Sequence, residues 1–362
     1  MDRVKWIFSN CPGDLEAIVI MNAEEPLLDV AFPYVTGTKA GLFEGCLGVV
    51  TPDGHSTIIA SSLEETSARA GRADVLIYRS RQEFDEVASP FLYSFRRVGF
   101  NAQGITHANY LELKRVAPRA ELVDVSSGLQ AARHIKDREE VARMRRACRI
   151  ASRVADDIPG FLSRGMREHE AAAEIEYRMM RGGASGAAFD TNASFGPSSA
   201  EPHHIAEDIV LQDGDTALFD FGCKVEGYCS DITRTFFVGE VKDWQRRMYQ
   251  VVQEAQLAAL GAIRAGVNGQ EVDAAARSVI DASELRGLMV HSTGHGLGLS
   301  VHDGGRMAMN HDFPLREGMV LTVEPGVYIA GKGGVRIEDD VLITAEGYEM
   351  LTDADRRMRV IP

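Results

Sequence analysis

Four acidic residues lie in apolar, strand-like segments of the second half of the chain and could act together on one ligand. Asp220 lies in segment 216–221, and Asp231 lies in segment 230–236 after a glycine-containing turn. Glu324 ends segment 320–324, and Glu338 ends segment 335–338 after a second glycine-rich turn. If each pair of segments folds as a hairpin about its midpoint, Asp220 lies opposite Asp231 and Glu324 lies opposite Glu338.

Two carboxylates that face each other across a hairpin repel, and they need a shared proton or a cation between them. The second pair repeats the first at offsets of 104 and 107 residues. A duplicated half-domain with facing hairpins would therefore collect four carboxylates in one place. Because burying unpaired carboxylates is costly, the pattern predicts a dinuclear metal site.

A glycine-rich segment, HSTGHGLGLSVH at residues 291–302, supplies a nitrogen ligand. Glycines let its backbone pass close to a ligand. His295 and the four acids form an oxygen-dominated donor set that suits manganese, cobalt, iron or zinc better than copper. Four negative charges match two divalent cations, and a bridging hydroxide derived from water would be the nucleophile in a hydrolysis.

These residues must be positioned by two domains, which we expect at residues 1–133 and 134–362. In the first, candidate strands at 17–21, 45–51, 56–60, 74–78 and 121–125 alternate with helical stretches, and a Pro52-Asp53-Gly54 turn indicates a hairpin. This alternation favours an α/β layer domain.

The second domain begins with a long helix. Apolar residues recur at three- and four-residue steps from about residue 137 to 162, with Asp137 as N-cap and Glu140 three residues later. A weak repeat follows: Gly165 precedes Glu170 and an alanine-rich helix, and Gly266 precedes Glu271 and another. The offset of 101 residues resembles that of the acidic pairs.

Composition narrows the class of protein. The chain has 362 residues, 45% of them hydrophobic, and a net charge of −14, which argues against nucleic acid or anionic membrane as the main partner. Five cysteines without a CxxC pair fit neither a disulfide framework nor a structural zinc site, and Cys223 and Cys229 are expected to be small buried apolar residues. The start of the chain lacks the apolar region of a secretory signal, so a cytoplasmic location is expected.

Several motifs together resemble one family, the pita-bread metallopeptidases, in the branch of prolidase and aminopeptidase P. They are Pro202-His203-His204, LFDFG around Asp220, GYCSDITRTF around Asp231, STGHGLGLSVHD from Ser292, GMVLTVEPGVY around Glu324 and VRIEDD around Glu338. The resemblance implies an α/β (α+β) fold with an N-terminal creatinase-like α/β domain and a C-terminal pseudo-twofold pita-bread catalytic domain. The N-terminal domain would serve dimerisation and substrate access.

The resemblance also implies residue roles. Two divalent metals, manganese or alternatively cobalt, zinc or iron, would be held by Asp220, Asp231, His295, Glu324 and Glu338, with Asp231 and Glu338 bridging them. His302 would stabilise the tetrahedral intermediate, and Glu324 would shuttle a proton to the leaving nitrogen. Catalytic or substrate-pocket roles fall to His203, His291 and Tyr328, and Arg336 would support the ligands from behind.

Other residues of the same types receive structural interpretations. His204 is as consistent with a structural role as with a catalytic one, and Arg234 is expected to be structural. The remaining histidines, which have no chemical context, are assigned to surface or packing roles: His55, His107, His134, His169 and His311.

The implied substrates are small peptides with proline at position two, and the family habit implies a homodimer. Arg306, four residues after His302, matches an arginine suited to binding a dipeptide's carboxylate in archaeal-type prolidases. The loop VHDGGRMAMN departs from the VHE-proline pattern of prolidases and has the VHD of aminopeptidase P. We therefore expect an Xaa-Pro dipeptidase, with an Xaa-Pro aminopeptidase as the alternative. A metal-free creatinase-like hydrolase or a binding protein is a remoter alternative.

Overall fold

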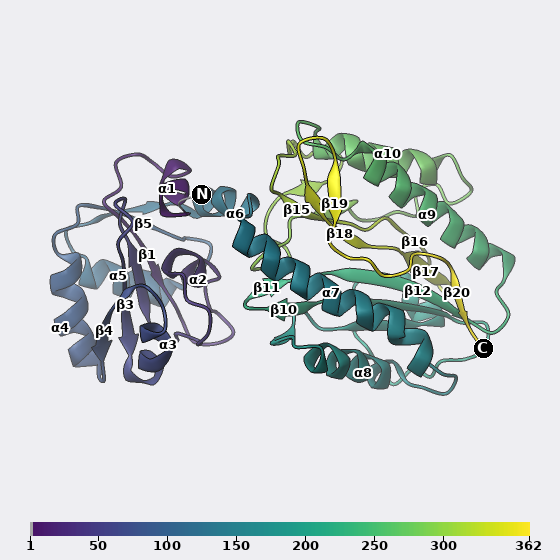
Figure 1. The fold of residues 1–362 in the computed structure, drawn as a ribbon, viewed down its shortest axis with the longest axis horizontal. Coiled ribbons are helices and arrows are strands. Elements are labelled where there is room, and N and C mark those ends of the chain that lie inside the picture. Colours follow the sequence, from purple (N-terminus) through teal and green to yellow (C-terminus); the bar gives the residue numbers. More distant parts are fainter. Residues whose placement is uncertain (1–2) are drawn as a thin grey trace. The chain divides into compact units, whose positions relative to one another are not determined.

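The structure, a computed structural model, describes residues 3–362 and separates into two compact units, Met1–Arg133 and His134–Pro362 (Figure 1). Within the described residues, no helix is both long enough and apolar enough to cross a membrane. The five cysteines are all free, and Cys223 and Cys229 are buried as predicted.

The first unit is built on a six-stranded mixed sheet with strand order β4-β3-β2-β1-β5-β6. Its strands are β1 (Ala17–Met21), β2 (Leu47–Val50), β3 (Ser56–Ser61), β4 (Asp74–Tyr78), β5 (Arg97–Phe100) and β6 (Glu121–Asp124). Its helices are α1 (Arg3–Ser9), α2 (Ala31–Thr36), the short 3-10 helix η1 (Ser62–Glu64), α3 (Glu65–Arg69), α4 (Arg81–Leu92), α5 (His107–Val116) and α6 (Ser126–His134). The α/β expectation and the β2–β3 hairpin are confirmed. The sequence reading missed β5, because Arg97 and Gly99 leave only two apolar side chains in this short strand.

The second unit combines several small sheets with four long helices, which Figure 1 shows as two pairs, α7 with α8 and α9 with α10. The helices are α7 (Arg138–Phe161), α8 (Glu168–Arg181), the short 3-10 helix η2 (Gly196–Ala200), α9 (Asp243–Ala262) and α10 (Gly269–Asp281). The strands of the first half are β7 (Gly186–Ala187), β8 (Asn192–Phe195), β9 (Thr216–Phe221), β10 (Cys223–Val225), β11 (Tyr228–Cys229) and β12 (Ile232–Val238). Those of the second half are β13 (Gly294–His295), β14 (Arg306–Met307), β15 (Val320–Val323), β16 (Gly326–Ile329), β17 (Gly333–Arg336), β18 (Asp339–Ile343), β19 (Tyr348–Met350) and β20 (Arg359–Ile361).

The two halves of this unit repeat one another in hydrogen bonding. The Gly165 N–H donates to the carbonyl of Leu211 at 2.9 Å, and the Gly266 N–H donates to that of Leu315 at 2.8 Å. Glu170 and Glu271 each accept the N–H of the residue three positions earlier, which makes both of them capping-box residues of α8 and α10. The weak sequence repeat thus corresponds to a structural repeat.

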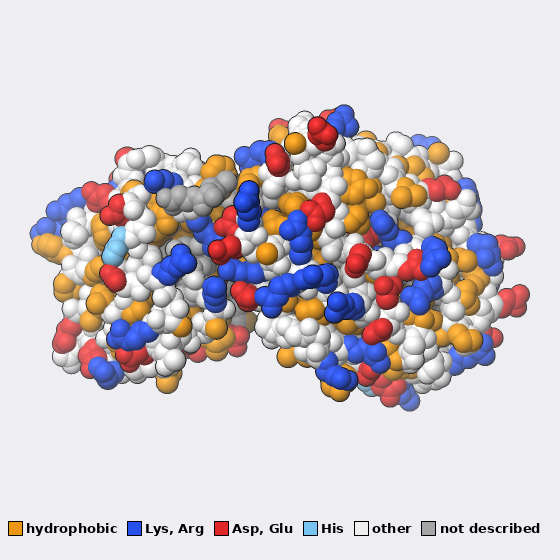
Figure 2. Space-filling view, in the orientation of Figure 1, with side chains coloured by type: hydrophobic (Ala, Val, Ile, Leu, Met, Phe, Trp, Pro, Cys, Tyr) orange, Lys and Arg blue, Asp and Glu red, His pale blue; other side chains and the backbone are white. Residues whose placement is uncertain are grey.

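Helix α7 begins as the sequence predicts. The Asp137 side chain caps it by accepting hydrogen bonds from the N–H groups of Glu139 and Glu140. In return, the Glu140 carboxylate accepts a hydrogen bond from the Asp137 N–H. One face of α7 is buried, whereas its solvent face carries arginines, seen as blue side chains over this helix in Figure 2. Arg145 pairs there with Glu349 at 2.7 Å.

Two hydrophobic cores of the second unit each belong mainly to one half, and a smaller third core joins α7 to β11 and β15. Residues of α9 and α10 pack with β15 to β18 in one core, and residues of α7 and α8 pack with β8, β9 and β12 in the other. The strands that carry the predicted metal ligands therefore lie between two packed helix layers, which hold them rigidly.

Candidate metal centre

Four of the five predicted metal ligands lie at the ends or interruptions of strands in the second unit, and Asp220 lies within a strand. Asp220 is the fifth residue of β9, and Asp231 directly precedes β12. His295 ends β13, Glu324 directly follows β15, and Glu338 lies between β17 and β18. At such positions a side chain can leave the regular ladder and turn toward a common centre.

The predicted register of the first hairpin is wrong. Asp220 pairs with Thr233, not with Asp231. The turn is centred on Glu226 and Gly227, which both have positive φ (48° and 84°), so it falls one residue later than expected. The resulting slip is two residues, and because side chains alternate with a period of two, Asp220 and Asp231 still belong to the same face.

The second hairpin has the predicted register. Val323 pairs with Asp339 before the interruption, and Gly326 pairs with Arg336 after it. This common register brings Glu324 across from Glu338 in the gap between the two ladders. There the strands separate: the Glu324 N–H donates to the Thr293 carbonyl at 2.8 Å, and the Glu338 N–H donates to the Thr233 carbonyl at 3.2 Å.

Side chains from both halves converge on one buried point. Asp231, His295 and Glu338 each offer a ligand atom, and these atoms lie within 4.8 Å of one another. The Nε2 atom of His295 is 3.7 Å from Asp231 Oδ2 and 3.5 Å from Glu324 Oε1. Asp220 is half-buried and accepts a hydrogen bond from Arg336 Nη2. Chain segments about a hundred residues apart thus supply one set of donors.

The electrostatics of this point are unfavourable to ionised acids. Burial raises the pKa of Asp231 well above its ordinary value, and the charges of Glu338 and Asp220 raise it further. Burial likewise raises the pKa of Glu338, followed by the charges of Glu324 and Asp220. Burial also raises the pKa of Glu324 to about 7. One arginine, Arg336, cannot neutralise four carboxylates.

The donor set fits divalent cations. Among the described residues, Asp220 Oδ1 and Asp231 Oδ1 are buried and have no hydrogen-bond partner. Burial lowers the pKa of His295 to about 4, so the imidazole is neutral at neutral pH, the form that binds metals. Its Nδ1 lies 3.1 Å from the Gly296 carbonyl, which can only accept, so Nδ1 carries the proton and Nε2 presents a lone pair to the acids.

A hydrogen-bonded chain supports these acids from behind. The Thr233 hydroxyl donates to Glu338 Oε2 at 2.6 Å and accepts from Arg336 Nε at 2.9 Å. Arg336 Nη1 donates to the Tyr328 hydroxyl at 2.8 Å, and this hydroxyl lies 2.8 Å from His291 Nε2. Arg336, Tyr328 and His291 are therefore connected to the acids, although the sequence only suggested their proximity.

The remaining predicted residues lie around this centre. The ring of His302, which is exposed, lies 4.3 Å from the ring of His295, centroid to centroid. His203 is exposed and close enough to lower the pKa of both His291 and His302. Arg306 pairs with His295 in the β13–β14 ladder and is exposed.

Two ambiguous residues have structural contacts. His204 Nε2 lies 2.7 Å from the buried carboxylate of Glu168, which also accepts the Phe195 N–H at 2.7 Å. Arg234 is buried and pairs with Asp339 at 2.7 Å. The buried ion pair supports the structural interpretation of Arg234, and the contact with Glu168 favours the structural one of the two alternatives for His204.

Sequence reasoning missed three supporting residues. Gln256 of α9 donates to the carbonyls of Val323 and Ile337, which directly precede Glu324 and Glu338. Asp273 of α10 accepts the N–H of Thr293 at 3.0 Å, two residues before His295. Asp340 accepts the N–H of Asp231 at 3.0 Å. Only Asp340 had a sequence signal, the run of three acids that begins at Glu338.

Comparison with known proteins decides the family. Residues 142–345 match metallopeptidase family M24. The chain belongs to this family. Residues 13–135 match the creatinase/prolidase N-terminal domain, so the predicted family, enzyme class and two-part fold are confirmed.

Some of the proteins that this chain is similar to are named Xaa-Pro dipeptidase, and another is named X-Pro aminopeptidase. The Xaa-Pro dipeptidase of Pyrococcus furiosus is 40% identical over 250 residues, which are 69% of this chain and 71% of the relative. The solved Xaa-Pro dipeptidase from Bacillus anthracis has a TM-score of 0.91 and 31% identity, and the match covers 99% of both chains. The solved X-Pro aminopeptidase from Thermotoga maritima has a TM-score of 0.89 and 31% identity over 96% of this chain and 98% of that one.

Proposed function

We propose that this M24 metallopeptidase hydrolyses Xaa-Pro peptide bonds with two divalent metal ions, and that Xaa-Pro dipeptides are its preferred substrates. The observation that carries the metal-dependent part is the convergence of Asp231, His295 and Glu338 within 4.8 Å, with Glu324 3.5 Å from His295. The Xaa-Pro part is supported by relatives and structural neighbours that are named Xaa-Pro dipeptidase or X-Pro aminopeptidase.

In this proposal Asp220, Asp231, His295, Glu324 and Glu338 hold the metals, with manganese as the expected metal and cobalt, zinc and iron as alternatives. Metal ions bound by such donors polarise a carbonyl and lower the pKa of water so that it can act as a nucleophile. The chain's own residues would then bind the peptide, orient it and move its protons.

The protein groups around the centre suit these tasks. The exposed His302, beside the His295 ring, can donate a hydrogen bond to the scissile carbonyl oxygen as its negative charge grows. A carboxylate oxygen of Glu324 can receive a proton and pass it to the leaving imino nitrogen. His203 and His291 would line the substrate pocket, and Tyr328 would hold His291 through its hydroxyl.

Preference for dipeptides depends on Arg306. Its guanidinium is exposed beside the site and can bind the free carboxylate that a dipeptide places next to the scissile bond. We expect Arg306→Ala to raise the KM for Xaa-Pro dipeptides far more than the KM for Xaa-Pro-Yaa tripeptides. Equal losses on both substrates would reject this role for Arg306.

The direct test compares hydrolysis of one Xaa-Pro dipeptide and one Xaa-Pro-Yaa tripeptide, with manganese added and with chelator as control. Chelator-sensitive cleavage of the dipeptide supports an Xaa-Pro dipeptidase. Preferential cleavage of the tripeptide supports the alternative, an Xaa-Pro aminopeptidase. Failure to cleave either peptide would reject the proposed substrate class. The homodimer implied by the resemblance can be tested on the same sample by light scattering.

A further inference from the structure

Three consecutive acids, Glu338, Asp339 and Asp340, are all buried, with exposures of 1%, 0% and 0%. Only Glu338 belongs to the donor set of the proposed metal centre. Burying a carboxylate is costly unless it is paired or hydrogen-bonded. The other two acids therefore need roles of their own.

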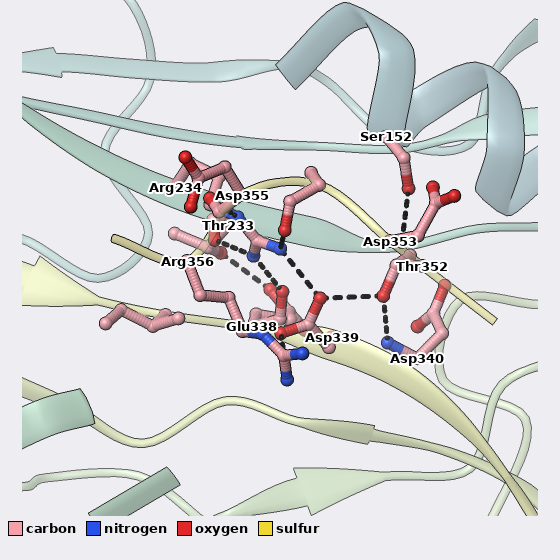
Figure 3. A network of polar contacts seen from close by, with 12 residues as sticks. Ser152, Thr233, Arg234, Glu338, Asp339, Asp340, Thr352, Asp353, Asp355 and Arg356 are labelled. Carbon is pink, nitrogen blue, oxygen red and sulfur yellow. Dashed lines mark hydrogen bonds and ion pairs between the residues drawn. The ribbon is translucent and has the colours of Figure 1, made fainter. Parts of the chain in front are cut away.

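Asp339 has a structural role that its contacts explain. Its carboxylate accepts from Arg234 Nη2 at 2.7 Å, from the Thr352 hydroxyl at 2.8 Å and from Gln256 Nε2 at 2.9 Å. Figure 3 shows Arg234 and Thr352 reaching it from two sides. A buried arginine compensates its charge, so Asp339 anchors this part of the fold.

Asp340 has different partners. Its Oδ2 atom accepts the backbone N–H of Asp231 at 3.0 Å and the thiol of Cys148 at 3.2 Å. Among the described residues, its Oδ1 atom has no hydrogen-bond partner. Within residues 3–362, the one main-chain group that this side chain binds is thus the N–H of a proposed metal ligand, 109 residues away in the sequence.

Local geometry explains why Asp231 needs an acceptor from elsewhere. It lies between β11 and β12, where the hairpin ladder is interrupted. Opposite it the chain is tightly packed, because a Cβ at Gly222 would lie 1.8 Å from the Ser230 carbonyl oxygen. The buried Asp231 N–H makes its hydrogen bond outside the ladder, to Asp340, and without Asp340 it would lose this partner.

We propose that Asp340 is a positioning residue that orients the backbone of Asp231, so that the carboxylates of Asp231 and Glu338 can share metal ions. The bond joins the two halves of the repeat, because Asp231 belongs to the first hairpin and Asp340 to the second. Asp340 follows Glu338 by two residues, so one short segment supplies a ligand and also holds a ligand of the other hairpin. This inference rests on the proposed metal centre.

The test uses the full-length protein, stripped of metal and titrated with manganese alone by calorimetry. Asp340→Leu replaces the carboxylate with an apolar group of similar size, whereas Asp340→Asn keeps an acceptor oxygen. Ser152→Ala is the matched control: it removes an acceptor for the Asp353 N–H, at 2.9 Å, in the same polar network but away from the ligands (Figure 3). Exchange of the Asp231 amide hydrogen is measured in the metal-free proteins as a second readout.

We expect Asp340→Leu to weaken manganese binding by about 10- to 100-fold, the usual cost of losing a group that supports a metal ligand. It should also accelerate exchange of the Asp231 amide. Asp340→Asn should remain close to wild type in both measurements, and Ser152→Ala should bind manganese as wild type does.

Three outcomes would overturn the inference: wild-type affinity in Asp340→Leu, unchanged exchange of its Asp231 amide, or a loss in Asp340→Asn as large as in Asp340→Leu. Asp340→Ala replaces Asp340→Leu in the series if the leucine variant does not fold, and Asp340→Asn tests the acceptor role in either case. Absence of manganese binding by the wild-type protein would instead reject the proposed metal centre. The amide exchange would still decide whether Asp340 holds Asp231.

Discussion

Asp231 and Glu338 illustrate, at the scale of single residues, how a buried site can oppose folding. Burial raises the pKa of each carboxyl. The charge of Glu338 raises the pKa of Asp231 further, and the charges of Glu324 and Asp220 raise the pKa of Glu338, so the charged forms of both acids are unfavourable in the metal-free protein. Such an arrangement is stable when cations lie among the acids. The burial and mutual repulsion of these carboxylates destabilise the metal-free protein, and the same closely spaced charges attract the metal ions.

Replacing one of these acids should therefore raise the stability of the metal-free protein and lower its affinity for metal. We expect Glu338→Gln to stabilise the metal-free protein, since it removes a buried carboxyl whose charged form is unfavourable beside Glu324 and Asp220. The variant should also lose manganese binding and turnover. Thermal unfolding in chelator and calorimetry with manganese measure the two effects, and Glu346→Gln, an exposed site on the same segment, is the control. Full manganese affinity in Glu338→Gln would contradict the ligand assignment.

His291 should impose a pH dependence on folding. Burial and, to a smaller extent, the charge of Arg336 together lower its pKa to about 4. The unfolded chain, where histidine has its ordinary pKa of about 6.5, therefore binds more protons between these values, so stability rises with pH across this window. In His291→Gln this contribution is absent. The difference in unfolding free energy between wild type and variant should grow in favour of wild type from pH 4 to pH 6.5. A constant difference would contradict the neutral state of the partly buried His291.

At the scale of elements, the interruption of the second hairpin decides where its acids point. The strands pair as β15 with β18 and as β16 with β17, and between these ladders Glu324 and Glu338 bond to other segments. The carbonyls of Val323 and Ile337 at this gap receive hydrogen bonds from Gln256 of helix α9, at 3.2 and 3.3 Å. Helix α9 thus keeps the two strands apart at the ligands.

Removal of the Gln256 amide should affect both stability and the metal centre. We expect Gln256→Leu to destabilise the fold by about 1–3 kcal/mol, the cost of leaving buried polar groups unsatisfied, and to weaken manganese binding by about tenfold. Gln253→Leu is the matched control on the same helix, because Gln253 donates to the Arg356 carbonyl at 2.7 Å, away from the ligands. Denaturant unfolding and calorimetry give the two quantities. Equal manganese affinity in both variants would mean that α9 does not position the acids.

At the scale of the whole molecule, all predicted metal ligands belong to the unit His134–Pro362. The first unit, described from residue 3 to residue 133, contributes none of them. Metal binding stabilises only the folded part that holds the metal, by about 2.7 kcal/mol when its concentration is 100 times the dissociation constant. The two units should therefore respond differently to metal.

Removal of metal with a chelator should lower hydrogen-exchange protection in β12 and in β15 to β18. Protection of the sheet β4-β3-β2-β1-β5-β6 in the first unit should stay unchanged. Mass spectrometry of exchanged peptides, with and without manganese, measures both at once. The same loss of protection in both units, or none in the second, would contradict a metal centre confined to the second unit.

The sequence by itself determined the features that depend on neighbouring residues. The cap of α7 at Asp137 and five of the six strands of the first sheet follow from local patterns of polarity and turn residues. The acids at 220, 231, 324 and 338 stand out because ionisable residues rarely occur in apolar strands. Their motifs also identified the M24 family.

Tertiary structure alone decided which of these residues meet and how they are held. The register of the first hairpin depended on a turn at Glu226-Gly227 that sequence spacing placed one residue too early. Likewise, the bonds from Asp340 to Asp231 and from Gln256 to the second hairpin join segments 67 to 109 residues apart. Periodicity describes the face of one element, whereas such contacts arise from the packing of several elements around a common core, and no local pattern encodes that packing.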